Sequence, residues 1–385
     1  MTIGLLGMTG QGMDKDDNLG RHFPDPTEQL LRLLNMKLTS TLNEVSERAK
    51  ALIEDNFVAD ILMPGCPFDG LFKSNGEYLL RVLDGYRANG VDWVSVTVGL
   101  DHFPSIEKTT QIIASYRNIF NPNINPMTAE RFALIRSVEE MEAAKATGKL
   151  AVNFNFQGSM PLLGNLDMVE LYYSLGVGQM LLAYNDKNLV GDGCHERTDC
   201  GLSKFGLNLV AKMNQVGMIV DLTHTGERTT LEASEASTEP VIYSHSNPLA
   251  LNEHGRNISD AQIKACAATG GVIGVNGVGA YMSKAGDNVS ADIIIKQIDY
   301  IAELVGAEHV GFGLDYVDNV DYLNEIVAEH PTKFPADQGY HDVKFAKPDA
   351  IPHIVEGLLA KNYSDEQVKG ILGENFLRVC RQVWR

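Results

Sequence analysis

The chain has 385 residues, of which 44% are hydrophobic and 21% are charged, so it has enough apolar side chains for a folded core and is not intrinsically disordered. Its 32 lysines and arginines against 50 aspartates and glutamates give a formal net charge of −18. Such a surface repels nucleic acid and anionic lipid, so we expect a small-molecule partner and no binding to nucleic acid or membrane.

The sequence favours a cytoplasmic protein without a membrane span. No run of 18 apolar residues occurs, and no basic segment precedes the short apolar run near the N-terminus. The cysteines are few and odd in number, which favours free thiols in a reducing compartment over a disulfide framework. They are Cys66, Cys194, Cys200, Cys266 and Cys380.

The first part of the chain, residues 1–50, is predicted to form an N-terminal arm. A helix is expected over residues 26–51, where leucines cluster between charged residues. No linker, internal repeat or low-complexity segment divides the remainder. We therefore expect residues 51–385 to form a single catalytic domain.

Eight apolar runs rich in Val, Ile, Phe or Tyr alternate with segments of helical periodicity. The runs cover residues 57–63, 92–99, 150–157, 178–185, 218–224, 241–245, 272–276 and 310–315. Apolar residues at three- and four-residue spacing predict helices over 76–89, 128–147, 204–215, 261–269, 291–305 and 365–384.

This alternation predicts an α/β fold with a parallel sheet covered on both faces, and eight units predict a single closed (β/α)8 TIM-type barrel. A doubly wound open sheet is the rival fold. It usually carries a glycine-rich phosphate turn after an early strand, and none follows the first two runs. The glycines between residues 270 and 279 lie in and around the seventh run instead.

In such barrels the working residues lie at the C-terminal ends of the strands. His224 and His245 end consecutive runs, so their imidazoles are expected to face one mouth of the barrel and to bind zinc or another divalent metal. Two buried core histidines are the alternative. Further polar residues at run ends are Asp60, Gln157, Tyr184, Asn185 and Asn276, of which Gln157 and Asn276 are candidates for substrate binding.

Asp315 ends the eighth run, where an unpaired buried carboxylate would cost several kcal/mol, so it needs a partner and is a candidate general base. A capping or loop-bracing aspartate is the alternative. Arg256 lies in a polar loop and offers a bidentate fork to a substrate carboxylate, although a surface ion pair fits equally well. Cys194, His195 and Cys200 do not match a common zinc ligand spacing.

From about Met218 onward the chain resembles the membrane (renal) dipeptidase family of metallohydrolases. The segments that carry the resemblance are GMIVDLTH, EPVIYSHSN, HGRNISDAQI, GGVIGVN, HVGFGLDY and ILGENFLRV, in the family's order. Weaker similarity extends back to the first run. The resemblance implies a β/α barrel, usually dimeric, with two zinc ions that hydrolyse dipeptides, including those with a C-terminal D-residue.

By position, the resemblance makes His224 and His245 ligands of one metal, Arg256 the carboxylate-binding residue and Asp315 the residue that handles the proton. The family's D-G-H-x-D signature is replaced by residues 60–64 (DILMP), without the ligand histidine and the second aspartate. The bridging glutamate falls on Gln157, and a further histidine falls on Tyr184, which we assign as an oxyanion donor.

These replacements argue against a second metal. Two dications about 3.5 Å apart repel by about 19 kcal/mol at an effective dielectric constant near 20, and Asp315 is the single carboxylate left at the aligned positions. We expect at most one divalent metal, zinc by preference, with water, Asp315 or the Gln157 carbonyl completing its shell. Asp69, Asp186 and Asp192 are alternative ligands from loops.

The sequence therefore predicts a dipeptidase-like hydrolase that acts on a small dipeptide-like or amino-acid-like carboxylate, as a homodimer. Two alternatives stay open. One is a non-hydrolytic proton-transfer enzyme, an isomerase or lyase, on the same barrel. The other is a catalytically silent relative that binds a ligand in the old pocket.

Overall fold

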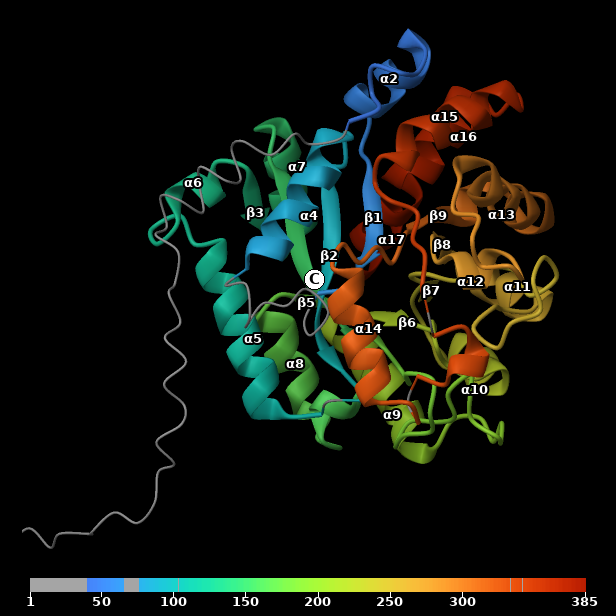
Figure 1. Ribbon diagram of the computed structural model, residues 1–385. Helices are drawn as coiled ribbons and strands as arrows, with labels where there is room; N and C mark the ends of the chain where they lie inside the picture. Colours follow the sequence, from blue (N-terminus) through green and yellow to red (C-terminus); the bar gives the residue numbers. More distant parts are fainter. Residues whose placement is uncertain (1–39, 66–75, 103, 333, 341) are drawn as a thin grey trace, which may run out of the picture. The chain divides into compact units, whose positions relative to one another are not determined.

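The computed structural model describes residues 40–65 and 76–385 except 103, 333 and 341, and from Leu38 onward the chain forms one compact unit (Figure 1). Its centre is a closed ring of eight parallel strands, which confirms the predicted barrel. The ring consists of β1 (Ala59–Met63), β2 (Trp93–Leu100), β4 (Leu150–Gln157), β5 (Val177–Leu181), β6 (Ile219–Asp221), β7 (Ile242–Tyr243), β8 (Val272–Asn276) and β9 (Val310–Gly313).

The ring closes because β1 pairs with both β2 and β9, and β2 pairs directly with β4. An additional strand, β3 (Phe132–Leu134), pairs with the first residues of β4. β5 joins the same strand further along, from Phe154 onward. Thus β3 lies beside the ring without belonging to it.

Helices surround the strands (Figure 1). They are α2 (Glu47–Asp55), α4 (Glu77–Ala88), α5 (Ile106–Ile119), α6 (Pro126–Ala129), α7 (Val138–Ala146), α8 (Asp167–Ser174), α9 (Lys204–Val216), α10 (Glu227–Ala236), α11 (Asp260–Ala268), α12 (Gly279–Met282), α13 (Ala291–Val305), α14 (Val320–Glu329), α15 (Ala350–Ala360), α16 (Asp365–Lys369) and α17 (Asn375–Val383). No helix of the described residues is both long and apolar enough to cross a membrane.

Most predicted helices occur within one or two residues of their expected bounds, and α13 matches exactly the range 291–305. The single helix predicted over 128–147 is wrong: α6, β3 and α7 occupy this region. Phe132 is buried and its strand adds hydrogen bonds to the edge of β4, while Ser137 caps the new helix that follows. Pairing with a neighbouring strand thus overrides the local helical pattern.

The two ends of the chain also differ from the prediction. The helix predicted over 26–51 begins at Glu47 in its described part and extends to Asp55, and residues 26–39 of that prediction lie outside the described residues. The helix predicted over 365–384 is divided into α16, a π-helical turn over 370–374 and α17, with non-helical backbone at Gly373. The arm boundary at residue 50 stays a prediction.

Gly274 in β8 and Gly313 in β9 allow close approach of the backbone at Ser244, directly after β7. A Cβ atom would lie 2.1 Å from the Ser244 carbonyl oxygen at Gly274 and 1.8 Å from it at Gly313. Such distances are forbidden for any side chain, so glycine is required at both positions. These two glycines of the seventh and eighth runs thus serve close packing beside the segment that carries His245.

Candidate active site

His224 and His245 lie in the segments that follow β6 and β7, a few residues beyond the strand ends. Both side chains are buried, and their Nε2 atoms are 3.0 Å apart. His224 has φ 65°, a left-handed conformation that is uncommon for residues other than glycine and often occurs at functional sites. The structure therefore brings together the two predicted metal ligands.

The outer nitrogen of each imidazole is held by a polar side chain. His224 Nδ1 lies 2.6 Å from Asn185 Oδ1, and His245 Nδ1 lies 2.8 Å from Ser244 Oγ. Burial, reinforced by the Arg256 cation, lowers the pKa of both histidines well below the usual value. Both rings are thus neutral at physiological pH, the state in which imidazole binds metal ions.

Asp315 follows β9 in a left-handed conformation with φ 57°. Burial raises the pKa of its carboxyl group to about 7, against the opposing effects of Arg256 and of a hydrogen bond from Asn276. Asn276 Nδ2 donates to Asp315 Oδ2 at 3.2 Å and to the His245 carbonyl oxygen at 3.4 Å. Asn276 therefore links the carboxyl group to the histidine segment, and Asp315 can gain or lose a proton near neutral pH.

Arg256 is a buried cation, only 2% exposed. Its Nη2 donates to the His245 carbonyl oxygen at 3.2 Å, its Cζ lies 5.1 Å from the Tyr281 ring centroid, and its Nε has no hydrogen-bond partner. Among the described residues it forms no ion pair within 4 Å. A buried charge that makes no direct ion pair is costly, so this guanidinium is suited to binding an anionic group.

Tyr184 stacks on the His224 ring, with centroids 3.8 Å apart and an interplanar angle of 21°. His102 contacts Tyr184 edge-on at 4.9 Å. Burial raises the pKa of the Tyr184 phenol well above its usual value, so the hydroxyl keeps its proton and can donate a hydrogen bond. Gln157 is less central: its side chain donates to Thr97 Oγ1 at 2.9 Å inside the barrel.

Cys194 and His195 reach the site from the loop between β5 and α9. Cys194 Sγ donates to Asn185 Oδ1 at 3.4 Å, and burial raises the pKa of the thiol to about 11. His195 Nε2 lies 3.4 Å from the Tyr340 hydroxyl, and burial lowers the pKa of His195 to about 4. Cys200 is exposed.

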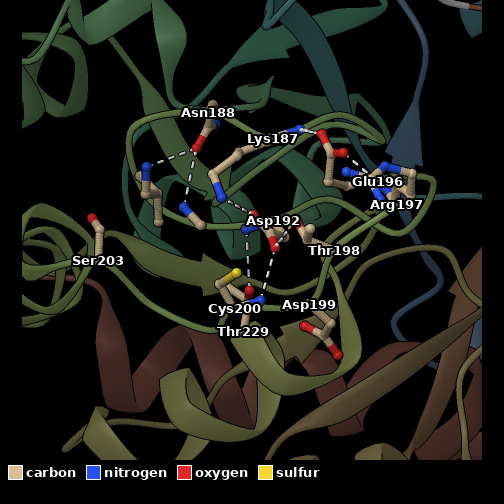
Figure 2. A network of polar contacts seen from close by, with 12 residues as sticks. Lys187, Asn188, Asp192, Glu196, Arg197, Thr198, Asp199, Cys200, Ser203 and Thr229 are labelled. Atoms are coloured by element: carbon tan, nitrogen blue, oxygen red, sulfur yellow. Dashed lines mark hydrogen bonds and ion pairs between the residues drawn. The ribbon is translucent and has the colours of Figure 1, made fainter.

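Asp192 organises this loop, as Figure 2 shows. Its carboxylate pairs with Lys187 Nζ at 2.9 Å and accepts hydrogen bonds from Thr198 Oγ1 at 2.9 Å and from the Cys200 backbone N–H at 2.8 Å. These contacts occupy Asp192, one of the alternative metal ligands. Asp69 lies outside the described residues.

In the part of the chain that the structure describes, no three His, Cys, Asp or Glu side chains gather in a way that could hold a metal ion. The histidine pair is thus a two-ligand arrangement. A metal cluster of Cys194, His195 and Cys200 is not formed by these described side chains.

Several residues of the site were given no role by the sequence. Asp101, directly after β2, accepts hydrogen bonds from the backbone N–H groups of Met160 at 2.7 Å and Tyr184 at 3.1 Å. Its position directly after a strand could have marked Asp101 as a candidate site residue. Tyr281 and Tyr340 come from segments after β8 and β9 that carry no strand pattern, so only the folded chain places Tyr281 beside Arg256 and Tyr340 beside Asn185.

Comparison with known proteins identifies the family of the chain. The family model for membrane dipeptidase, peptidase family M19, matches residues 107–385. The chain belongs to this family. The resemblance to the membrane dipeptidase family inferred from the sequence is thereby confirmed.

Individual members of the family differ considerably from this chain. An uncharacterised dipeptidase of Schizosaccharomyces pombe is 30% identical over 292 residues, which are 74% of this chain and 63% of that protein. The dipeptidase tcpJ of Claviceps purpurea is 26% identical over 311 residues, 79% of this chain and 68% of that protein. The chain thus spans about two thirds of the length of these relatives.

A solved structure is similar over nearly its full length. An amidohydrolase from Pseudomonas aeruginosa superposes with a TM-score of 0.76 at 29% identity, covering 87% of this chain and 99% of that one. The barrel and its surrounding helices are therefore shared with this member of the amidohydrolases.

Proposed function

We propose that this chain hydrolyses a small dipeptide-like or amino-acid-like substrate that carries a free carboxylate. The observation that supports this most directly is Arg256, which is buried without an ion-pair partner among the described residues and has an unsatisfied Nε. A substrate carboxylate would form the direct ion pair that Arg256 lacks, through a bidentate fork. The relatives' names as dipeptidases point to the same substrate class.

In this proposal the histidine pair holds one divalent ion. Two imidazole ligands of a tetrahedral zinc ion have their nitrogens roughly 3.3 Å apart, given Zn–N bonds of about 2.0–2.1 Å, and the 3.0 Å between the two Nε2 atoms is close to this. The described residues offer no cluster of three ligand side chains, so the proposal rests on two histidine ligands and includes no second ion. An ion held by His224 and His245 would act as a Lewis acid toward the scissile carbonyl.

The chain's own residues would divide the remaining work. Arg256 holds the substrate carboxylate, and Tyr184 donates its phenolic proton in a hydrogen bond to the oxygen on which negative charge develops. Asp315, oriented by Asn276, accepts a proton from the attacking water and returns it to the leaving amine. Gln157 as a substrate contact, a homodimer and a cytoplasmic location are further parts of this proposal, which rest on the sequence and the resemblance.

A panel of dipeptides with free carboxylates, in L,L and L,D forms, assayed beside their C-terminal amides, tests the proposal. We expect release of free amino acids, with kcat/KM at least about 30-fold higher for the carboxylates than for the amides. This factor is the lower end of the effect expected when a buried charge is left unpaired. Binding without turnover would favour the silent relative. Substrate loss without release of amino acids would favour an isomerase or lyase.

A further inference from the structure

The amide of Asn185 contacts three side chains of the candidate site. Its Oδ1 lies 2.6 Å from His224 Nδ1 and 3.4 Å from Cys194 Sγ, and its Nδ2 donates to the Tyr340 hydroxyl at 2.9 Å. The Asn185 side chain is fully buried, so water cannot replace these contacts. The protonation pattern of His224 therefore depends on which end of the amide faces it.

The neighbours of Asn185 decide this orientation. With the oxygen toward His224, the Cys194 thiol also donates to Oδ1 and the amide nitrogen has an acceptor in the Tyr340 hydroxyl. The opposite orientation would set the amide N–H groups against the thiol S–H and leave the thiol without its oxygen acceptor. Cys194 and Tyr340 thus favour an oxygen, which can only accept, beside His224 Nδ1.

The backbone holds the two residues in this relationship. Asn185 has φ 61° and His224 has φ 65°, and the Asn185 N–H donates to the His224 carbonyl oxygen at 3.2 Å. The Cys194 N–H donates to the same oxygen at 2.9 Å. Asparagine tolerates a left-handed conformation better than most residues, which suits it to this position.

We propose that Asn185 is a positioning residue that holds neutral His224 in the tautomer protonated on Nδ1, so that the lone pair of Nε2 faces His245. This inference deepens the proposed function and rests on it, because a metal ion or a proton shared by the pair can be bound only by an unprotonated nitrogen. It also gives Cys194 and Tyr340 a role as the residues that orient the amide.

Nuclear magnetic resonance of metal-free protein labelled with ¹⁵N-histidine tests the proposal, because long-range ¹H–¹⁵N correlations show which ring nitrogen carries the proton. The His224 signals are assigned by their loss in His224→Gln. We expect the proton on Nδ1 in the unmodified protein. In Asn185→Ala we expect it to move to Nε2, the nitrogen that a neutral imidazole in water prefers to protonate.

Two further variants separate positioning from general destabilisation. Asn185→Asp keeps an acceptor at this place and should retain the proton on Nδ1. Asn375→Ala removes another buried amide, which binds the Ala307 and Val310 carbonyl oxygens, and should leave His224 unchanged. A proton on Nε2 in the unmodified protein would overturn the proposal without any variant, as would an unchanged tautomer in folded Asn185→Ala.

Zinc titration of the same proteins distinguishes this inference from the proposed function. We expect Asn185→Ala to weaken zinc binding by about 10- to 100-fold, as loss of a partner of a ligating histidine does, and Asn185→Asp to restore most of it. If the unmodified protein binds no zinc but His224 is protonated on Nδ1, the metal part of the proposed function fails and the positioning role stands. If zinc binds and the proton lies on Nε2, the positioning role alone fails.

Discussion

The Nε2 atoms of His224 and His245 are 3.0 Å apart, although the residues follow different strands and are separated by 21 positions in the chain. Both rings are neutral, because burial lowers both pKa values. A neutral imidazole pair at this distance must share either a proton or a metal ion. The first prediction follows from this pair.

Protein purified without chelator should contain about one equivalent of zinc or another divalent metal, and His224→Ala or His245→Ala should lose most of it, because a single imidazole is a weak site. Elemental analysis measures this directly. His353→Ala is the matched control, since its exposed ring lies 3.4 Å from a Glu44 carboxylate oxygen and away from the histidine pair. Two equivalents in the unmodified protein would contradict the two-ligand interpretation of the site.

Arg256→Ala should raise KM for dipeptides with a free carboxylate by about 30-fold or more, because a buried charge pair is lost, and should have little effect on the corresponding amides. Arg256→Lys should recover only part of the loss, since an ammonium group lacks the planar fork. Arg228→Ala, at an exposed ion pair with Glu232, is the control. Equal effects on carboxylates and amides would remove Arg256 from carboxylate recognition.

Protonation of Asp315 should lower kcat/KM at acidic pH, which gives the pH profile an acid limb. Its pKa is raised to about 7 by burial, and a general base must be deprotonated, so activity should rise as the pH increases through about 7. Asp315→Asn should reduce the rate by roughly 100- to 10,000-fold and abolish this limb. If the limb persists at the same pH in the variant, another group is responsible, and Asp60 is then the first to examine because its pKa is also about 7.

Asp60 should make the folded protein less stable as the pH rises. Burial raises its pKa to about 7, although Tyr86 and the Leu62 and Leu314 N–H groups donate to it. The folded state therefore binds this proton more tightly than the unfolded chain. The resulting stability is complete below about pH 4 and is lost as the pH rises to about 7.

Between pH 5 and pH 8 the lost stability amounts to about 3 kcal/mol. The loss accumulates over roughly two pH units, from pH 5 to the pKa of Asp60 near 7. Asp60→Asn keeps an oxygen acceptor and cannot ionise, so its urea unfolding midpoint should fall less over this range than that of the unmodified protein. Asp365→Asn, at an exposed ion pair with Arg48, is the control. An identical pH dependence in Asp60→Asn and the unmodified protein would mean that Asp60 does not titrate in this window.

The sequence alone determined the barrel and the residues at its mouth. Each of its eight apolar runs matches a strand of the ring, with β2 and β5 extending one residue beyond their runs, because a strand buried on both faces needs a continuous apolar run. His224, His245 and Asp315 could be found at the ends of these runs, since parallel strands present their C-terminal ends on one face. For Arg256 the residues alone favoured neither a carboxylate-binding role nor a surface ion pair.

Only the tertiary structure decided how these residues are prepared for chemistry. The strand β3, the contact between Asn185 and Tyr340 across 155 positions, and the link from Asn276 to Asp315 all depend on segments that meet only after folding. Burial likewise sets the pKa of Asp315 and of the histidines, and burial is a property of the packed chain. Local periodicity specifies which residues become strands, whereas hydrogen-bond partners and desolvation are set by neighbours distant in the sequence.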